Sequence, residues 1–132
     1  MKVFFDACVL FSASKRGSLM QGLALAVLSK AKGVTNVHAV REAERNLLQK
    51  CPSWMDDFRL LTGRIPLVHQ AVRVEGVDLP EKDWPILGGA IASGCTHLLT
   101  SDKRHFHKLF DAPIHGVRVV LPRTLASLLS EA

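Results

Sequence analysis

Four acidic residues stand beside apolar segments, where their carboxylates could act together on a bound cation. Asp6 interrupts the apolar stretch KVFFDACVLF, and Asp102 follows the stretch HLLT with one serine between them. Asp83 precedes the apolar stretch WPILGGAIA, and Glu42 lies within HAVREAERNLLQK. Brought together, these carboxylates would repel one another unless they shared protons or bound a cation, and Mg²⁺ and Mn²⁺ favour oxygen ligands. A metal ion held in this way can ionise water for attack on a phosphodiester and stabilise the leaving oxygen.

The elements that must position these acids alternate between short apolar strands and helices. Strands are predicted at residues 2–5, 34–37, 64–68, 97–100 and 117–121. Helices are predicted at residues 17–32 (ended by Gly33), 38–50, 53–63 (capped by Ser53), 83–94 (capped by Asp83) and 122–132, and residues 101–110 form a loop or short helix. This alternation is typical of βαβ units, so we expect an α/β fold in which a mostly parallel sheet is covered on both faces. A chain of this length is expected to form a single domain, residues 1–132.

Two of the acids follow strands of this predicted sheet. In parallel sheets, ligands bind outside the carboxyl ends of the strands. Asp6 follows the first strand and Asp102 follows the strand at 97–100, so we expect both carboxylates at the same edge. Asp83 opens the helix that leads into that strand, and Glu42 lies in the second helix. A doubly wound fold would therefore bring all four acids together.

Each acid also has a purely structural explanation. Asp83 could serve only as a helix N-cap, and Glu42 could pair with an arginine of its own helix. Asp102 in TSDK could be part of a turn. Asp6 is the hardest to explain in this way, because its neighbours on both sides are typical of a protein core. The joint placement of the four acids carries the hypothesis.

The composition is that of a globular protein with reduced cysteines. Hydrophobic residues make up 48% of the chain, and the longest nearly apolar stretch, LMQGLALAVL, is too short to span a bilayer. No signal peptide precedes the first strand, so we expect a cytoplasmic protein without membrane contact. Cys8, Cys51 and Cys95 form no C-x-x-C pair, and their odd number argues against a disulfide framework.

Basic residues outnumber acidic ones, which favours phosphate-rich partners. Lys and Arg number 17 against 12 Asp and Glu, and without the four candidate acids the balance rises from +5 to +9. Lys15 and Arg16 follow the loop after the first strand, and Lys103 and Arg104 follow Asp102. We expect both clusters near the same edge of the sheet, as phosphate contacts. The candidate substrate contacts are Lys15, Arg16, Ser101, Lys103, Arg104 and His105.

Two histidines follow Asp102 in the stretch HFHK. His105 and His107 lack the i, i+4 spacing of a helical zinc motif, and no cysteine ligand lies nearby in the sequence. Hydrogen-bonded loop histidines are therefore favoured over a transition-metal site. His105 remains a candidate for contact with a substrate beside the metal.

The sequence resembles the PIN-domain ribonucleases in three stretches: VFFDACVLFSA, VREAERNL and EKDWPILGGAIASGCTHLLTSDKRHF. The resemblance covers nearly the whole chain. It implies a three-layer α/β/α sandwich with a central parallel sheet, and Mg²⁺- or Mn²⁺-dependent cleavage of RNA. The acidic residues of the family fall on Asp6, Glu42, Asp83 and Asp102. Many small members are toxins of toxin–antitoxin pairs of the VapC type, so the resemblance also implies an antitoxin partner and a homodimer.

The chain departs from the family pattern at two positions near these acids. Cys8 stands where the family usually has asparagine, and cysteine cannot supply the donors and acceptor of an amide. Ser101 stands where glycine is common. Two alternatives remain: a degenerate PIN fold that binds RNA or protein without cleavage, and a phosphatase of the haloacid dehalogenase type. The second needs an aspartate two residues after Asp6, where this chain has Cys8.

Overall fold

A four-stranded, all-parallel sheet forms the centre of the molecule. The computed structural model describes residues 1–131. The strands are β1 (Lys2–Phe5), β2 (Lys32–Val34), β3 (His97–Leu99) and β4 (Arg118–Val120), in the spatial order β2-β1-β3-β4. Phe4 of β1 is paired with Val34 on one side and Leu98 on the other. Both central strands are buried and apolar, as expected where helices cover both faces of a parallel sheet.

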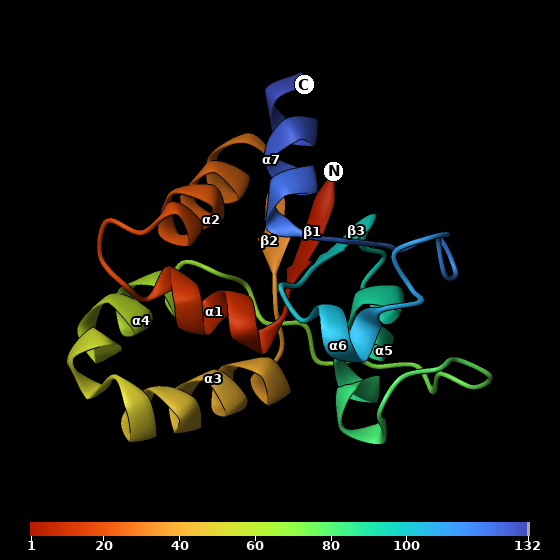
Figure 1. Cartoon of the computed structure of the whole chain (residues 1–132), viewed down its shortest axis with the longest axis horizontal. Helices are drawn as coiled ribbons and strands as arrows, with labels where there is room; N and C mark the ends of the chain where they lie inside the picture. Colours follow the sequence, from red (N-terminus) through yellow and green to blue (C-terminus); the bar gives the residue numbers. More distant parts are fainter. Residues whose placement is uncertain (132) are drawn as a thin grey trace.

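Helices flank this sheet in three layers, which confirms the predicted α/β/α sandwich. They are α1 (Ala7–Ala13), α2 (Leu19–Lys30), α3 (Val37–Lys50), α4 (Met55–Thr62), α5 (Trp84–Ala92), α6 (Lys103–Phe106) and α7 (Pro122–Glu131), with 3-10 turns at Pro52–Trp54 and Glu81–Asp83. Figure 1 shows both termini at one end of the molecule, while β1 runs from the N-terminus toward the region where α1, α5 and α6 meet. That region lies at the carboxyl end of the sheet.

The segment after Asp6 is helical, where the sequence predicted a loop. Helix α1 begins directly after the aspartate, whose Oδ1 accepts a hydrogen bond from Ala7 N at 2.7 Å. Contacts with α2, α3 and α4 surround this short helix. It is therefore apolar on most sides, and its sequence carries no amphipathic period that would reveal a helix.

The second strand begins earlier than predicted, and Gly33 lies within it. Helix α2 ends at Lys30, so Gly33 does not end the helix. Its lack of a side chain instead makes room for β1, since a Cβ at this position would lie 2.6 Å from Cε2 of Phe5. The predicted strand at 64–68 is reduced to a single bridge between Thr35 and Leu67.

The caps of two helices also differ from prediction. Asn36, predicted within a strand, is the N-cap of α3 and accepts a hydrogen bond from Ala39 N at 3.0 Å. Ser53 lies inside a 3-10 turn and caps no helix. Asp83 precedes α5 as predicted, but its side chain makes no capping hydrogen bond, which leaves the carboxylate available for other contacts.

Two further expectations concern the state of the cysteines and the presence of a membrane-spanning helix. All three cysteines are free thiols, as predicted. Within residues 1–131, every helix is too short or too polar to cross a lipid bilayer.

Candidate active site at the carboxyl edge of the sheet

The predicted meeting of Asp6 and Asp102 occurs where the chain reverses its direction of winding. The chain passes from β1 to β2 on one side, and β3 returns to the other side of β1. The crevice between β1 and β3 is thus the topological switch point, at which open parallel sheets bind their ligands. The backbone N–H of Asp6 donates to Leu99 O at 3.1 Å, which fixes the end of β1 against the end of β3.

Asp6 is buried and held by three donors. Its Oδ1 accepts from the backbone of Ala7, and its Oδ2 accepts from the Thr100 hydroxyl at 2.7 Å and from the Cys8 thiol at 3.4 Å. Only 4% of the residue is exposed. Burial raises the pKa of Asp6 above its ordinary value, although the hydrogen bonds from Thr100, Ala7 and Cys8 act in the opposite direction.

Thr100 connects Asp6 to Asp102. Its hydroxyl donates to Asp6 and accepts from the backbone N–H of Asp102 at 3.0 Å. Asp102 in turn caps α6, because its Oδ1 accepts from His105 N at 3.0 Å. The sequence analysis did not select Thr100. Its position at the end of an apolar strand, two residues before Asp102, is the signal that could have identified it.

Asp83 reaches the same edge from α5. The Nδ2 of Asn36 donates to Pro85 O at 3.1 Å and ties the first turn of α5 to the start of α3. Asp83 is 5% exposed, and its Oδ2 is buried without a hydrogen bond. Burial raises the pKa of Asp83; the positive charges of His105 and Lys82 lower it. Nearby acids add to the increase.

Those nearby acids include the remaining candidate, Glu42 of α3. The charges of Glu42 and Asp102 both raise the pKa of Asp83, and the charge of Asp83 raises that of Asp6. Glu42 is half-buried, whereas Glu44 is exposed. Within residues 1–131, no ion pair joins Glu42 to an arginine of its helix. Asp6, Glu42 and Asp102 thus each lie within electrostatic reach of Asp83.

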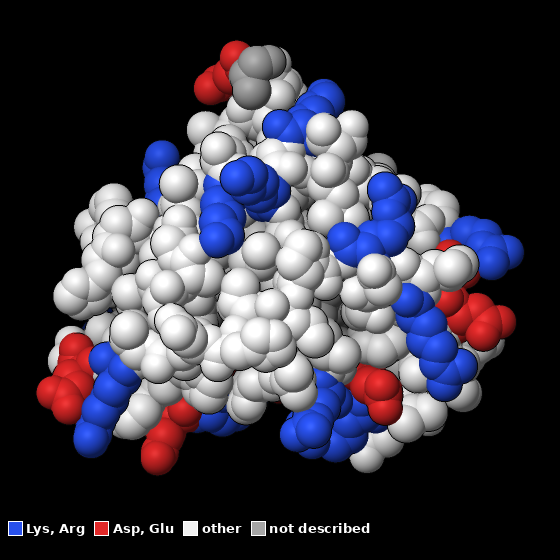
Figure 2. All heavy atoms as spheres, turned by 180° about the vertical axis from the view of Figure 1, so that it is seen from behind, with Lys and Arg blue, Asp and Glu red and all other residues white. Residues whose placement is uncertain are grey.

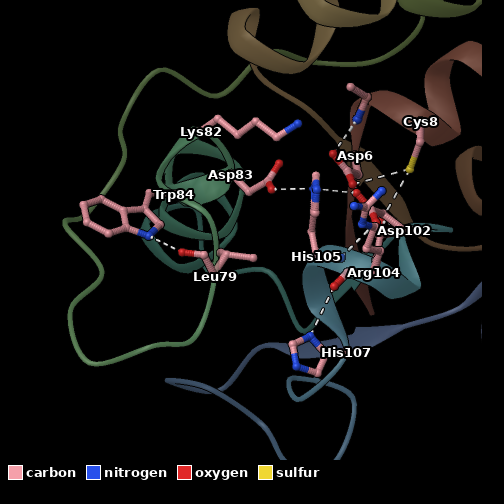
Figure 3. Close-up of polar contacts among 12 residues, drawn as sticks. Asp6, Cys8, Leu79, Lys82, Asp83, Trp84, Asp102, Arg104, His105 and His107 are labelled. Carbon is pink, nitrogen blue, oxygen red and sulfur yellow. Dashed lines mark hydrogen bonds and ion pairs between the residues drawn. The ribbon is translucent and has the colours of Figure 1, made fainter.

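His105 lies among these acids, although the sequence analysis favoured a loop histidine. Its Nδ1 is 3.0 Å from Asp83 Oδ2 and 2.8 Å from Asp102 Oδ2. Figure 3 shows the ring, carried by α6, between Asp83 on one side and Asp6 and Asp102 on the other. The i, i+3 spacing to Asp102 is visible in the sequence, but the approach to Asp83 depends on the tertiary fold.

Cys8 lies between the end of β1 and the loop after β3. Its thiol donates to Asp6, and its sulfur accepts from the backbone N–H of Ser101 at 3.4 Å. Burial, followed by the negative charge of Asp6, raises the pKa of Cys8 to about 11. The neutral thiol therefore links the end of β1 to the loop after β3.

The basic candidates fall into two groups. Arg16 lies beyond α1, about 10 Å of helix away from Asp6, and is paired with Asp57 at 2.8 Å. Helix α1 thus separates Arg16 from Asp6, and the side chain of Arg16 pairs with Asp57 instead. Lys103 and Arg104 lie exposed at the start of α6, directly after Asp102.

Lys82 is a basic neighbour of the acids that the sequence analysis missed. It precedes Asp83 and lowers the pKa of that residue, and Figure 3 shows its side chain directed toward the acids. Over the opposite face of the molecule, Lys and Arg are spread without a continuous patch (Figure 2). Near the acids, the basic side chains are those of Lys82, Lys103 and Arg104.

The donor set fits a divalent cation, although it is not closed around one. Carboxylate oxygens suit Mg²⁺ and Mn²⁺, and the unpartnered Oδ2 of Asp83 is the kind of buried acceptor that a cation satisfies. In the described conformation of residues 1–131, no three His, Cys, Asp or Glu side chains form a ready metal site. No protein-family model matches the chain, and no curated protein sequence matches it significantly.

Proposed function

We propose that this protein is a PIN-type endoribonuclease that cleaves RNA phosphodiesters with Mg²⁺ or Mn²⁺. The observation that carries the proposal is the Oδ2 of Asp83, which is buried without a hydrogen bond among three further acids at the switch point of the sheet. A buried carboxylate without a donor costs stability. Such a cost is expected where a cation is to be bound.

The side chains divide the work of the proposed reaction. Asp83 and Asp102 bind the cation, and Glu42 adds negative charge beside them. Asp6 is fixed by Thr100 and keeps a lone pair of its Oδ1 free, since each carboxylate oxygen has two and Ala7 N takes one. The bound ion would supply an activated water and stabilise the leaving oxygen.

The substrate is held from the basic side of the site. Lys103 and Arg104 project from the turn after Asp102, and Lys82 precedes Asp83. In the proposed complex, these side chains contact RNA phosphates, which positions RNA without reading its sequence.

The biological role that we propose is that of a cytoplasmic toxin, inhibited by an antitoxin protein and active as a homodimer. This role rests on the resemblance to small PIN-domain toxins. It predicts that expression of the chain alone arrests growth, and that a short reading frame beside its gene encodes a protein that restores growth. Harmless expression without such a frame would contradict it.

A cleavage assay tests the enzymatic function. We expect the protein to cleave single-stranded RNA with Mg²⁺ or Mn²⁺, and EDTA to abolish cleavage. Asp102→Asn should reduce cleavage by at least about 100-fold, while its folding persists because asparagine is also a good N-cap for α6. Asp78→Asn is the matched control, since Asp78 is an exposed acid paired with Lys108 at 3.0 Å, and it should cleave at the wild-type rate.

Two outcomes would favour the alternatives. Intact RNA across a broad panel of substrates, with metal present and RNA bound, would indicate a binding module. Release of phosphate from small phosphomonoesters, with a phosphate trapped on Asp6, would indicate a phosphatase of the haloacid dehalogenase type. The sequence gives the second little support, because Cys8 stands where that mechanism needs a second aspartate.

A further inference from the structure

Two buried side-chain atoms lack a hydrogen bond in the part of the chain that the structure describes, and they face each other. They are Asp83 Oδ2 and His105 Nδ1, which lie 3.0 Å apart. Asp102 Oδ2 lies 2.8 Å from the same nitrogen. Buried polar atoms almost always have partners, so a facing pair of unpartnered atoms requires an explanation.

The geometry of these atoms is not that of a hydrogen bond. The distances are short enough, yet neither oxygen lies along the N–H direction of the ring, since the nitrogen has no hydrogen-bonded partner. Ligands at right angles around an octahedral cation, with bonds of about 2.1 Å, lie about 3.0 Å apart. Their lone pairs point at the ion and therefore about 45° away from each other. The two distances at His105 match the spacing of such ligands, and the missing hydrogen bond at Nδ1 agrees with it.

From this match we propose that His105 Nδ1 is a direct ligand of the cation, together with Asp83 Oδ2 and Asp102 Oδ2. The inference deepens the proposed function and rests on its metal site, though not on RNA cleavage. Imidazole nitrogen suits transition metals, whereas Mg²⁺ takes oxygen ligands. The chemical consequence is a mixed nitrogen–oxygen site that prefers Mn²⁺ over Mg²⁺.

The side chains can close around an ion without refolding. Asp83 Oδ2 is restrained by no hydrogen bond. Asp102 caps α6 through its Oδ1 alone, so its Oδ2 takes no part in the cap. The His105 ring is carried by α6, whose first turn is fixed by the same Asp102 cap. In the described conformation, these donors do not form a metal site. In the proposed site, the two carboxylates rotate so that their oxygens and His105 Nδ1 surround one ion.

The competing explanation is that His105 is a counter-ion. A protonated ring would neutralise Asp83 and Asp102 and occupy the place of the cation. The two explanations predict opposite effects of removing the ring. Loss of a ligand weakens Mn²⁺ binding, whereas loss of a competitor strengthens it.

Mn²⁺ binding, followed by electron paramagnetic resonance, decides between them. Wild-type protein titrated with Mn²⁺ should show a ¹⁴N coupling typical of a directly bound imidazole. His105→Ala should lose that coupling and bind Mn²⁺ at least about tenfold more weakly, while its affinity for Mg²⁺ changes much less. His107→Ala is the matched control: His107 lies two residues away with a side chain 52% exposed, and both the coupling and the affinity should be unchanged.

Three results would overturn the inference: no nitrogen coupling in the wild type, Mn²⁺ binding by His105→Ala as tight as or tighter than wild type, or no binding of Mn²⁺ to the wild type. The coupling is measured on the wild type, so the result does not depend on whether the variant folds. A protein that shows the coupling but leaves RNA intact would retain this metal site and lose the proposed nuclease function. The two failures are therefore distinguishable.

Discussion

Replacing Asp83 with asparagine should stabilise the metal-free protein. The carboxylate is 5% exposed and its Oδ2 has no hydrogen bond, so at neutral pH the fold buries an unsatisfied acceptor. An unsatisfied buried group costs about 1–3 kcal/mol. Loss of the attraction to His105 and Lys82 offsets part of the gain. We therefore expect Asp83→Asn to raise the free energy of unfolding by about 1–2 kcal/mol, or about 4–8 °C in Tm.

The pH dependence of this gain follows from the sign of the pKa shift. In the folded state, the pKa of Asp83 is raised above its ordinary value of 3.8, which applies to the unfolded state. At pH values between the unfolded pKa and the folded pKa, the folded state therefore binds more protons than the unfolded state. The stability of the wild type therefore falls as pH rises through that window and is constant above it. Asp83→Asn should lack this fall. The stability of Asp83→Asn relative to wild type should be greatest above the folded pKa of Asp83. The difference should vanish near pH 3, where the wild-type carboxyl is protonated in both states.

Addition of Mn²⁺ should reverse the order of the two proteins. A ligand at 100 times its Kd adds about 2.7 kcal/mol to the protein that binds it, which exceeds the advantage of the variant. Thermal unfolding at pH 8, with EDTA or with Mn²⁺, measures both differences. Glu81→Gln changes an exposed acid of the same 3-10 turn and should differ from wild type by less than about 0.5 kcal/mol. An Asp83→Asn protein less stable than wild type in EDTA would refute the reasoning.

Two further pairs of substitutions, each a test variant with its control, examine the hydroxyl of Thr100 and the packing at Gly89. Thr100→Val removes the hydroxyl that donates to Asp6 at 2.7 Å. Urea unfolding at pH 8 should show a loss of about 2–3 kcal/mol in the free energy of unfolding, and Thr100→Ser should recover most of that loss. A valine variant as stable as wild type would contradict the role of the hydroxyl. Gly89→Ala places a Cβ 2.8 Å from Asn36 Nδ2 and should cost about 1–3 kcal/mol. Gly22→Ala, where a Cβ meets nothing within 4 Å in helix α2, should instead gain about 0.5–1 kcal/mol, and a similar loss in both alanine variants would contradict this packing argument.

The elements that the sequence predicted well are those whose local pattern agrees with the tertiary fold. β1 and β3 are short apolar runs, and the rule for parallel sheets then placed Asp6 and Asp102 at one edge. The start of α5 was predictable because an acid and Pro85 precede its apolar face. For these residues, local chemistry and the overall topology point in the same direction.

The errors occur where a tertiary contact decides the structure. Gly33 follows a helix-like stretch and has the composition of a helix stop, yet it lies in β2 because the Phe5 ring leaves no room for a side chain. The loop expected after Asp6 is α1, and that helix carries Arg16 away from the site. The contact between His105 and Asp83 joins α6 to the start of α5. No local pattern encodes such a contact.

In the proposed metal site, Asp83 and His105 matter more for metal binding than the identity of residue 8. The Cys8 thiol, with a pKa raised to about 11, stays protonated at neutral pH and can donate to Asp6. The bond is long and sulfur is a weak donor, so the 2.7 Å bond from Thr100 does most to orient Asp6. With cysteine at position 8, Asp6 is buried, partnered and in place. Asp83 and His105, by contrast, hold the two buried side-chain atoms within residues 1–131 that lack a hydrogen bond, and a bound cation would satisfy both at once.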